Sequence, residues 1–276
     1  MWAGSGSPSR GIGLRSGSAN EVKIIDADGT LVGTVDESRA PSLVHEGAVY
    51  LHRGQTYKVN QFDPDELLAV VDQVGDHEYT QPRTSTDISV IAVDDKQAVG
   101  PLELMLGQVE VTTQVTGYQR RERRSRKILS HEELELEPQR LVTRAFWYTI
   151  EHRICEDVGV ATSQLPGALH AAEHAMIGML PLFTICDRWD VGGVSTAMHQ
   201  DTLHPSIFIY DGYPGGTGIA ELGYQVAGRH LRATLDLLHA CGCKDGCPSC
   251  VVSPKCGNGN EPLDKAGAIA LLTLAP

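Results

Sequence analysis

Aromatic residues are scarce in this sequence of 276 residues: they make up 5% of it, although the hydrophobic fraction is 41%. A buried core must therefore rest on Val, Leu, Ile and Ala, and the chain is long enough for two domains of ordinary size. Basic residues are outnumbered too, since 23 Lys and Arg face 35 Asp and Glu. A chain that binds nucleic acid over its whole surface is usually basic, so any DNA contact must be local.

Long apolar runs are also missing. The longest apolar region, from Ala168 to Cys186, is interrupted by two histidines, a glutamate and a proline, and it is too polar for a transmembrane helix. Residues 1–20 are rich in Gly and Ser and lack the apolar stretch of a signal peptide. We therefore expect a flexible start, no membrane contact and a cytoplasmic location, with work at the nucleoid if the organism is a bacterium.

The predicted fold class is α+β, with a β-rich first half and a mixed second half. Between residues 21 and 140, short alternating runs are separated by turn signals such as Asp26-Ala27-Asp28-Gly29. This pattern predicts an antiparallel β module with a long basic hairpin at its end. The sequence pattern changes after residue 140, and residues 141–276 predict a mixed α/β domain. We expect its helices near residues 166–180, 218–239 and 262–272, and a buried strand at residues 206–210.

Five of the seven cysteines lie within the 16 residues from Cys241 to Cys256, and an odd local count argues against closed disulfide pairing. Zinc takes four such ligands in a tetrahedron, and Cys-x-x-Cys spacing lets one turn present two thiolates. The sequence therefore predicts one structural zinc ion, with Cys241 as the spare thiol at a helix end. A loop of free thiols and a redox pair are the alternatives. The predicted ligands are Cys243, Cys247, Cys250 and Cys256.

Six of the eight residues from 120 to 127 are Arg or Lys, and Glu122 interrupts this basic run. The run follows a segment in which apolar and polar residues alternate. On a protruding hairpin such a run could bind the phosphate backbone, and an adjacent tyrosine could stack on a base. The alternative is a solvated charged loop that the glutamates at 132, 133 and 135 neutralise. The predicted DNA contacts are Tyr118, Arg120, Arg121, Arg123, Arg124, Arg126 and Lys127.

His170-Ala-Ala-Glu173-His174 has the H-x-x-E-H spacing of an inverted zinc-protease motif. On a helix, the two histidines share a face, and Glu173 could act as the base of a zinc-dependent hydrolase. A third ligand would come from Glu221, Asp211 or His199. The competing interpretation is a buried polar cluster that fixes the helix to the loop of Asp187 and Asp190. Separately, the turn from Asp211 to Gly218 before a helix could bind a phosphate or could simply pack tightly.

The segment CKDGCPSCVVSPKCGNGNEPLDK, residues 243–265, resembles the C-terminal region of the Hrq-like and mitomycin-repair helicases of superfamily II. Other matching segments are LHAAEHA at 169–175, CD at 186–187, DVGG at 190–193, YDGYPGG at 210–216 and HEGAVYLHRG at 45–54 with Tyr57. The resemblance thus covers most of the chain, and the cysteine motif is its most specific part. It implies a four-cysteine zinc domain within an ATP-dependent helicase that moves 3′ to 5′ on DNA and serves DNA repair.

The chain departs from that family in one respect, because it contains neither a G-x-x-x-x-G-K-[ST] phosphate loop nor an Asp-Glu-x-His box. The resemblance therefore implies a motor-less C-terminal portion that is not catalytic alone. Its expected partners are single-stranded DNA, which it would guide, and the motor domains of the same parent protein. A pure docking module for a repair partner is the remaining alternative.

Overall fold

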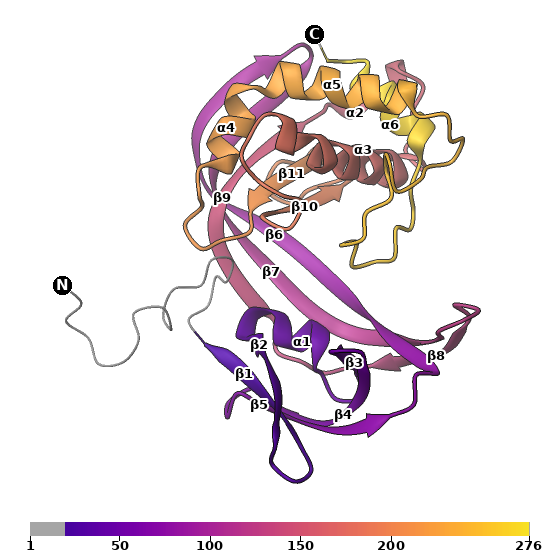
Figure 1. Ribbon diagram of the computed structural model, residues 1–276. Helices are drawn as coiled ribbons and strands as arrows, with labels where there is room; N and C mark the ends of the chain where they lie inside the picture. Colours follow the sequence, from indigo (N-terminus) through magenta and orange to yellow (C-terminus); the bar gives the residue numbers. More distant parts are fainter. Residues whose placement is uncertain (1–19, 276) are drawn as a thin grey trace, which may run out of the picture. The chain divides into compact units, whose positions relative to one another are not determined.

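The computed structural model describes residues 20–275, so the expected flexible start lies outside the described residues apart from Asn20. The described chain forms two compact units (Figure 1): residues 20–85 together with 113–139, and residues 86–112 together with 140–275. The sequence predicts a single boundary near residue 140. The structure assigns residues 86–112 to the second unit, because two long strands leave the first unit and continue in the second.

The first unit contains a five-stranded sheet of order β2-β1-β5-β4-β3. Its turn at Asp26 forms as the sequence predicts, because the Asp26 carboxylate accepts the backbone N–H of Thr30 at 2.8 Å and Gly29 adopts a φ of 79°. The sheet is not purely antiparallel, however, since β1 and β5 run parallel. The strands are β1 (Glu21–Asp26), β2 (Leu31–Asp36), β3 (Val49–His52), β4 (Gln55–Asp63) and β5 (Leu68–Val74), with the short helix α1 (Ala40–Leu43) after β2.

The second sheet has the order β10-β11-β9-β7-β6, with β8 paired to β7. Its period-two alternation divides the core: Phe146 and Tyr148 of β9 face one hydrophobic cluster, while Ala145 and Trp147 face another. Trp147 pairs with Phe208 across the antiparallel β9–β11 ladder and stacks on its ring. The strands are β6 (Glu78–Val99), β7 (Leu102–Glu122), β8 (Ile128–Glu133), β9 (Gln139–Thr149), β10 (Val191–Thr196) and β11 (Ser206–Asp211).

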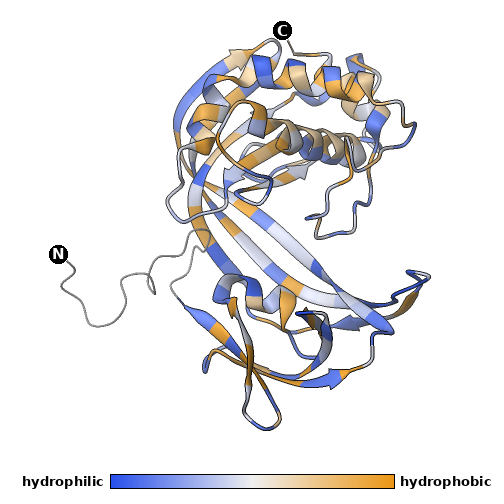
Figure 2. Ribbon diagram, in the orientation of Figure 1, coloured by the Kyte–Doolittle hydropathy of each residue, from blue (hydrophilic) through white to orange (hydrophobic). Residues whose placement is uncertain are grey.

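Helices cover the second sheet, and α3 (Leu165–Met179) lies at the centre of the core with twelve of its residues buried. The helix predicted over residues 218–239 is two helices, α4 (Ile219–Gln225) and α5 (Ala227–Ala240), which meet at Val226. Figure 2 shows hydrophilic and hydrophobic bands alternating along α5, as expected for an amphipathic helix. The remaining helices are α2 (His152–Asp157) and α6 (Lys265–Leu272). In the described part of the chain, no helix could span a membrane.

Candidate metal centre and nucleic-acid interface

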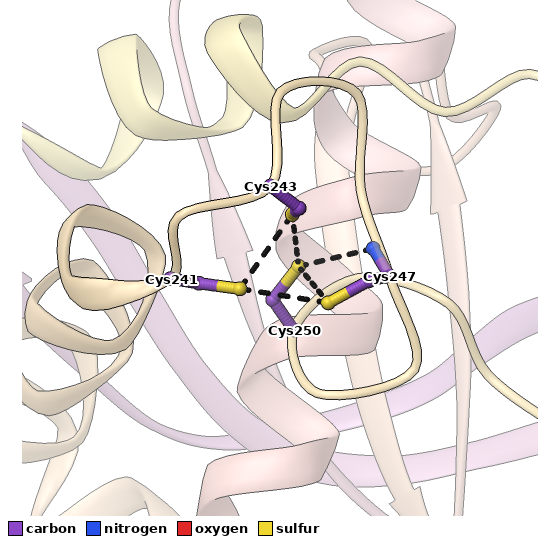
Figure 3. A group of neighbouring side chains, drawn as sticks. All are labelled: Cys241, Cys243, Cys247 and Cys250. Atoms are coloured by element: carbon purple, nitrogen blue, oxygen red, sulfur yellow. Dashed lines mark hydrogen bonds between the residues drawn. The ribbon is translucent and has the colours of Figure 1, made fainter.

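Four cysteine sulfurs converge where α5 ends and a short loop begins (Figure 3). Cys241 follows the last turn of α5, and its sulfur lies 3.5 Å from the sulfurs of Cys243 and Cys247. Cys250 completes the group at 3.4 Å from Cys243 and 3.8 Å from Cys247. All seven cysteines of the chain are free thiols, so these separations do not arise from disulfides.

The spacing of these sulfurs fits tetrahedral zinc. A Zn–S bond of roughly 2.3 Å places two thiolates of a tetrahedron roughly 3.8 Å apart. The Cys247–Cys250 turn is closed by the Cys250 N–H, which donates to the Cys247 carbonyl at 3.0 Å, and the Cys247 N–H points at the Cys250 sulfur at 3.3 Å. Gly246 supplies the positive φ of 119° that leads into this turn. The cluster is therefore preformed for one closed, four-sulfur metal site.

Lys265, at the start of α6, supplies positive charge to the cluster. Its ammonium donates to the carbonyl oxygens of Cys241 and Cys243 at 2.7 and 2.8 Å. Desolvation opposes ionisation of Cys243, but hydrogen bonds from the neighbouring thiols and from Lys265 lower its pKa to about 6. Burial raises the pKa of Cys250 to about 12. The cluster on its own thus favours a thiolate at Cys243, and a bound dication would favour ionisation of Cys250 as well.

The structure changes one member of the predicted ligand set. Cys241, expected to be the spare thiol, belongs to the four-sulfur group, while Cys256 lies apart from it and beside His170, 3.5 Å from Nε2. Sequence spacing allows either choice, because both cysteines are within a few residues of the Cys247–Cys250 turn. The path of the chain decides which cysteine joins the group, because Cys241, at the end of α5, faces the loop.

The H-x-x-E-H residues lie on α3, but they do not form the predicted hydrolytic arrangement. His170 and His174 turn toward the segment that follows the cysteine loop, whereas the Glu173 carboxylate packs against Gly193 of β10. Burial raises the pKa of Glu173 to about 7, and a hydrogen bond with Ser195 counteracts this shift. The buried polar cluster therefore holds α3 to β10 and to residues 251–262.

The three candidate third ligands of that hydrolase are engaged elsewhere. Glu221 accepts from Arg144 Nε at 2.8 Å, and His199 Nε2 lies 3.0 Å from the Ile88 carbonyl oxygen. Asp211 accepts the backbone N–H groups of Ala220 at 2.8 Å and of Ile219 at 3.3 Å. The same Asp211 contacts satisfy the first N–H groups of α4, so the turn before α4 is a tight packing turn that its own carboxylate occupies.

The basic residues lie at the end of the β7–β8 hairpin, in the first unit. Arg120 pairs with Glu78 at 2.7 Å and Arg123 pairs with Asp76, while the Arg121 guanidinium donates to Gln119 at 2.6 Å. The other three basic side chains are exposed, and within residues 20–275 no ion pair involves them. These free basic residues are Arg124, Arg126 and Lys127, and they are called the hairpin tip below.

Tyr118 does not fit the predicted base-stacking role. It is 9% exposed, and its ring lies against that of His45 with the centroids 4.5 Å apart. Gly47 adjoins the Tyr118 hydroxyl, where no side chain would fit. Beside this tyrosine is an open hollow of about 470 Å³ with four glutamates in its wall, at positions 46, 132, 133 and 135. Because carboxylates repel phosphates, DNA binding by this hairpin would be confined to its tip.

The sequence offers no signal for Lys265 beyond its place as the last residue of the resembling segment. A lysine one residue into a helix ordinarily indicates a solvated surface, yet this one is 5% exposed. Only the fold brings α6 to the carbonyl groups of the cysteine loop, because α6 packs on α3 and α5.

Comparison with protein families identifies a match to the MrfA Zn-binding domain over residues 172–251. That range includes most of α3 and all four sulfurs of the cluster. The chain therefore carries a Zn-binding domain with a four-cysteine cluster.

Among curated proteins, the chain is 32% identical over 256 residues to YprA of Bacillus subtilis, described as an uncharacterized ATP-dependent helicase. The match covers 91% of this chain and 34% of YprA. It is also 24% identical to the ATP-dependent helicase HRQ1 of Saccharomyces cerevisiae, over 96% of this chain and 26% of that protein. The chain thus spans about a third or less of the length of these relatives.

Among solved structures, the chain is similar to the DUF1998 helicase MrfA bound to DNA, with a TM-score of 0.69 and 30% identity. The alignment covers 99% of this chain and 36% of MrfA. Both units, and not only the cysteine domain, are therefore shared with that protein.

Proposed function

Because this chain belongs to the C-terminal region of the MrfA/YprA/Hrq1-type DUF1998 helicases, with an MZB zinc-binding domain, we propose that it guides single-stranded DNA. In this proposal, an ATP-dependent motor moves 3′ to 5′ on DNA during repair, and the chain guides the DNA strand that leaves this motor. The motor would be supplied by the rest of a longer protein, as the family has it. The chain itself contains no phosphate loop, so it would contribute DNA contacts and architecture rather than ATP hydrolysis.

The zinc ion is proposed to be structural. Cys241, Cys243, Cys247 and Cys250 would fill all four positions of a tetrahedral ion and leave none open for water or substrate. The ion would fix the loop between α5 and α6 and thereby hold α6 on α3. Structural zinc contributes on the order of 10 kcal/mol to the folding of small modules. Here the hydrophobic core around α3 shares that task, so partial folding without zinc is expected.

The observation that supports DNA binding best is the hairpin tip. Arg124, Arg126 and Lys127 are exposed on a chain whose formal net charge is -12, and within residues 20–275 no acidic partner neutralises them. A local basic tip on an acidic chain favours one narrow phosphate contact over general nucleic-acid binding. The paired side chains Arg120 and Arg123 would support the hairpin rather than touch DNA.

The test is single-strand binding by a variant in which Arg124, Arg126 and Lys127 are alanine. We expect weaker binding and a shallower dependence of log affinity on log salt, by up to about 0.7 for each phosphate that the variant no longer neutralises. The matched control removes three exposed basic charges elsewhere, at Lys23, Arg153 and Arg232. Equal effects of the two variants would indicate net charge rather than a specific role of the tip, and unchanged binding by the tip variant would refute the proposal.

A further inference from the structure

A second group of ligand-type side chains lies between α3 and the loop that follows the four-cysteine cluster. His170 and His174 are one helical turn apart on α3, and Cys256 approaches them from that loop. One ligand atom from each of the three lies within 4.8 Å of the others, and His170 Nε2 is 3.5 Å from the Cys256 sulfur. The pair His170 and Cys256 is 86 positions apart in sequence, so tertiary packing assembles the group.

The two imidazoles are held in the orientation that metal binding requires. Nδ1 of His170 lies 2.8 Å from the Pro262 carbonyl oxygen, and Nδ1 of His174 lies 2.7 Å from the Val251 carbonyl oxygen. A carbonyl oxygen only accepts, so each Nδ1 carries the proton and each Nε2 presents a lone pair. Metal-binding histidines are characteristically fixed in this way by a backbone carbonyl. Both side chains are at most 9% exposed, so the orientation is locked by packing.

The sulfur of Cys256 is also in contact with a backbone donor. The backbone N–H of Asn260 donates to it at 3.1 Å, which offsets part of the rise that burial causes in the pKa of this thiol. The Asn260 side chain closes the same loop, because its amide accepts from Ser253 N at 2.7 Å and donates to Ser253 O at 3.0 Å. While the thiol is uncharged, it donates a hydrogen bond to Asn258 Oδ1 at 2.6 Å. The loop is therefore shaped around the sulfur by contacts independent of the histidines.

We propose that His170, His174 and Cys256 form a second metal site, separate from the four-cysteine cluster, which binds a divalent cation of the zinc class. Zinc bonds of roughly 2.0 Å to nitrogen and 2.3 Å to sulfur place such ligands about 3.5 Å apart in a tetrahedron. The 3.5 Å between His170 Nε2 and the Cys256 sulfur agrees with this. Two nitrogens and one sulfur are a borderline-soft set that suits zinc better than magnesium or calcium.

The site would have three protein ligands and one position for water. That count is typical of catalytic zinc, but the carboxylate of Glu173 is turned toward Gly193 and Ser195 and does not join the group. We therefore expect a metal ion at this site to join the loop of residues 251–262 to α3. Such a site belongs to the architecture of the domain and does not depend on the DNA contacts proposed above.

The test is zinc per chain, measured by elemental mass spectrometry on the whole 276-residue chain after equilibration with excess zinc and removal of free metal. We expect two ions in the wild type and one in Cys256→Ser and in His174→Ala. His239→Ala, an exposed histidine of α5, is the matched control and should keep two. Cobalt substitution adds a second readout, because the sulfur-to-cobalt absorption of the four-cysteine site should persist in both site variants.

The outcomes separate the two sites. One ion in the wild type, lost in Cys241→Ser and kept in Cys256→Ser, would overturn the second site and leave the first intact. Two ions that both persist in Cys256→Ser would also overturn it. If His174→Ala does not fold, the nearly isosteric Cys256→Ser decides alone.

Discussion

The ammonium group of Lys265 lies 2.8 Å from the carbonyl oxygen of Cys243 and 3.4 Å from its sulfur. A zinc ion with four thiolates carries a net charge of about −2, so a buried cation beside it offsets part of that charge. The same ammonium bonds the Cys241 carbonyl, and it thereby connects the end of α5 to the start of α6. Lys265 thus has both an electrostatic and a geometric role at the candidate metal centre.

Replacing Lys265 with methionine should weaken zinc retention while keeping the aliphatic packing of the side chain. Loss of a group that orients and neutralises metal ligands typically costs roughly 10- to 100-fold in affinity. Competition with a chromophoric chelator measures this change. The control is Lys244→Met, since Lys244 is an exposed lysine within the cysteine loop. Equal retention by the two variants would show that Lys265 has no influence on the metal.

Replacing Cys241 with serine should release the zinc of the four-cysteine cluster and lower the midpoint of thermal unfolding. Serine preserves the size of the side chain but offers a poor ligand, so the effect isolates the sulfur. Cys186→Ser is the control, because Cys186 lies in neither group of candidate ligands. Zinc content and unfolding temperature are measured together. Should Cys241→Ser hold as much zinc as the wild type, the sequence-based ligand set with Cys256 would be restored.

The cluster itself was predictable, because five cysteines in one short loop leave few alternatives to a metal. Its membership was not. Cys241 and Cys256 flank the Cys247–Cys250 turn at six residues on either side, and spacing alone treats them alike. What separates them is that α5 delivers Cys241 into the cluster, while Asn260 folds the following loop so that Cys256 meets His170.

The fold class and most helices and strands could be predicted from the hydrophobic pattern of the sequence. The pattern did not show which face of a strand is buried. Alternation around Tyr118 predicts a strand, but it cannot show that the strand face with Tyr118 packs against His45 instead of being exposed to solvent. The same limit applies to Arg120, whose charge suggested DNA and whose neighbour is Glu78, 42 positions earlier in the chain. Non-local partners of this kind become visible only once the strands are paired.

Replacing Asp211 with asparagine should destabilise the second unit. The Asp211 carboxylate is fully buried and accepts N–H groups of Thr217, Ile219 and Ala220 at the start of α4. An amide keeps one acceptor oxygen, but it turns an NH₂ group toward those donors and removes the charge favoured at a helix N-terminus. We expect a loss of about 1–3 kcal/mol in the free energy of unfolding.

Urea denaturation of Asp211→Asn measures that loss, and Asp236→Asn, at an exposed position of α5, is the control. An Asp211→Asn variant as stable as the wild type would mean that the carboxylate does not cap α4. In that case the turn from Asp211 to Gly218 would again become a candidate phosphate site.

Acid should destabilise the second unit through His230. This histidine is fully buried, Nε2 donates to the Met176 carbonyl at 2.7 Å, and within the described residues Nδ1 has no hydrogen-bond partner. Burial lowers its pKa from 6.5 to about 4, and the bond to Met176 counteracts only part of this shift. Protonation at Nδ1 would bury an unpaired charge beside the rings of Phe146 and Phe183.

The sign follows from the direction of the pKa shift. Between pH 6.5 and about pH 4, His230 is protonated in the unfolded chain but not in the folded chain. Stability therefore falls as the pH is lowered through this window. The loss is on the order of 3 kcal/mol at its lower end, since each pKa unit corresponds to about 1.4 kcal/mol. His230→Gln keeps a donor for the Met176 carbonyl and does not titrate, so its free energy of unfolding should change less between about pH 7 and pH 5. Parallel pH dependence in the wild type and His230→Gln, followed by urea denaturation, would assign the acid sensitivity to other groups.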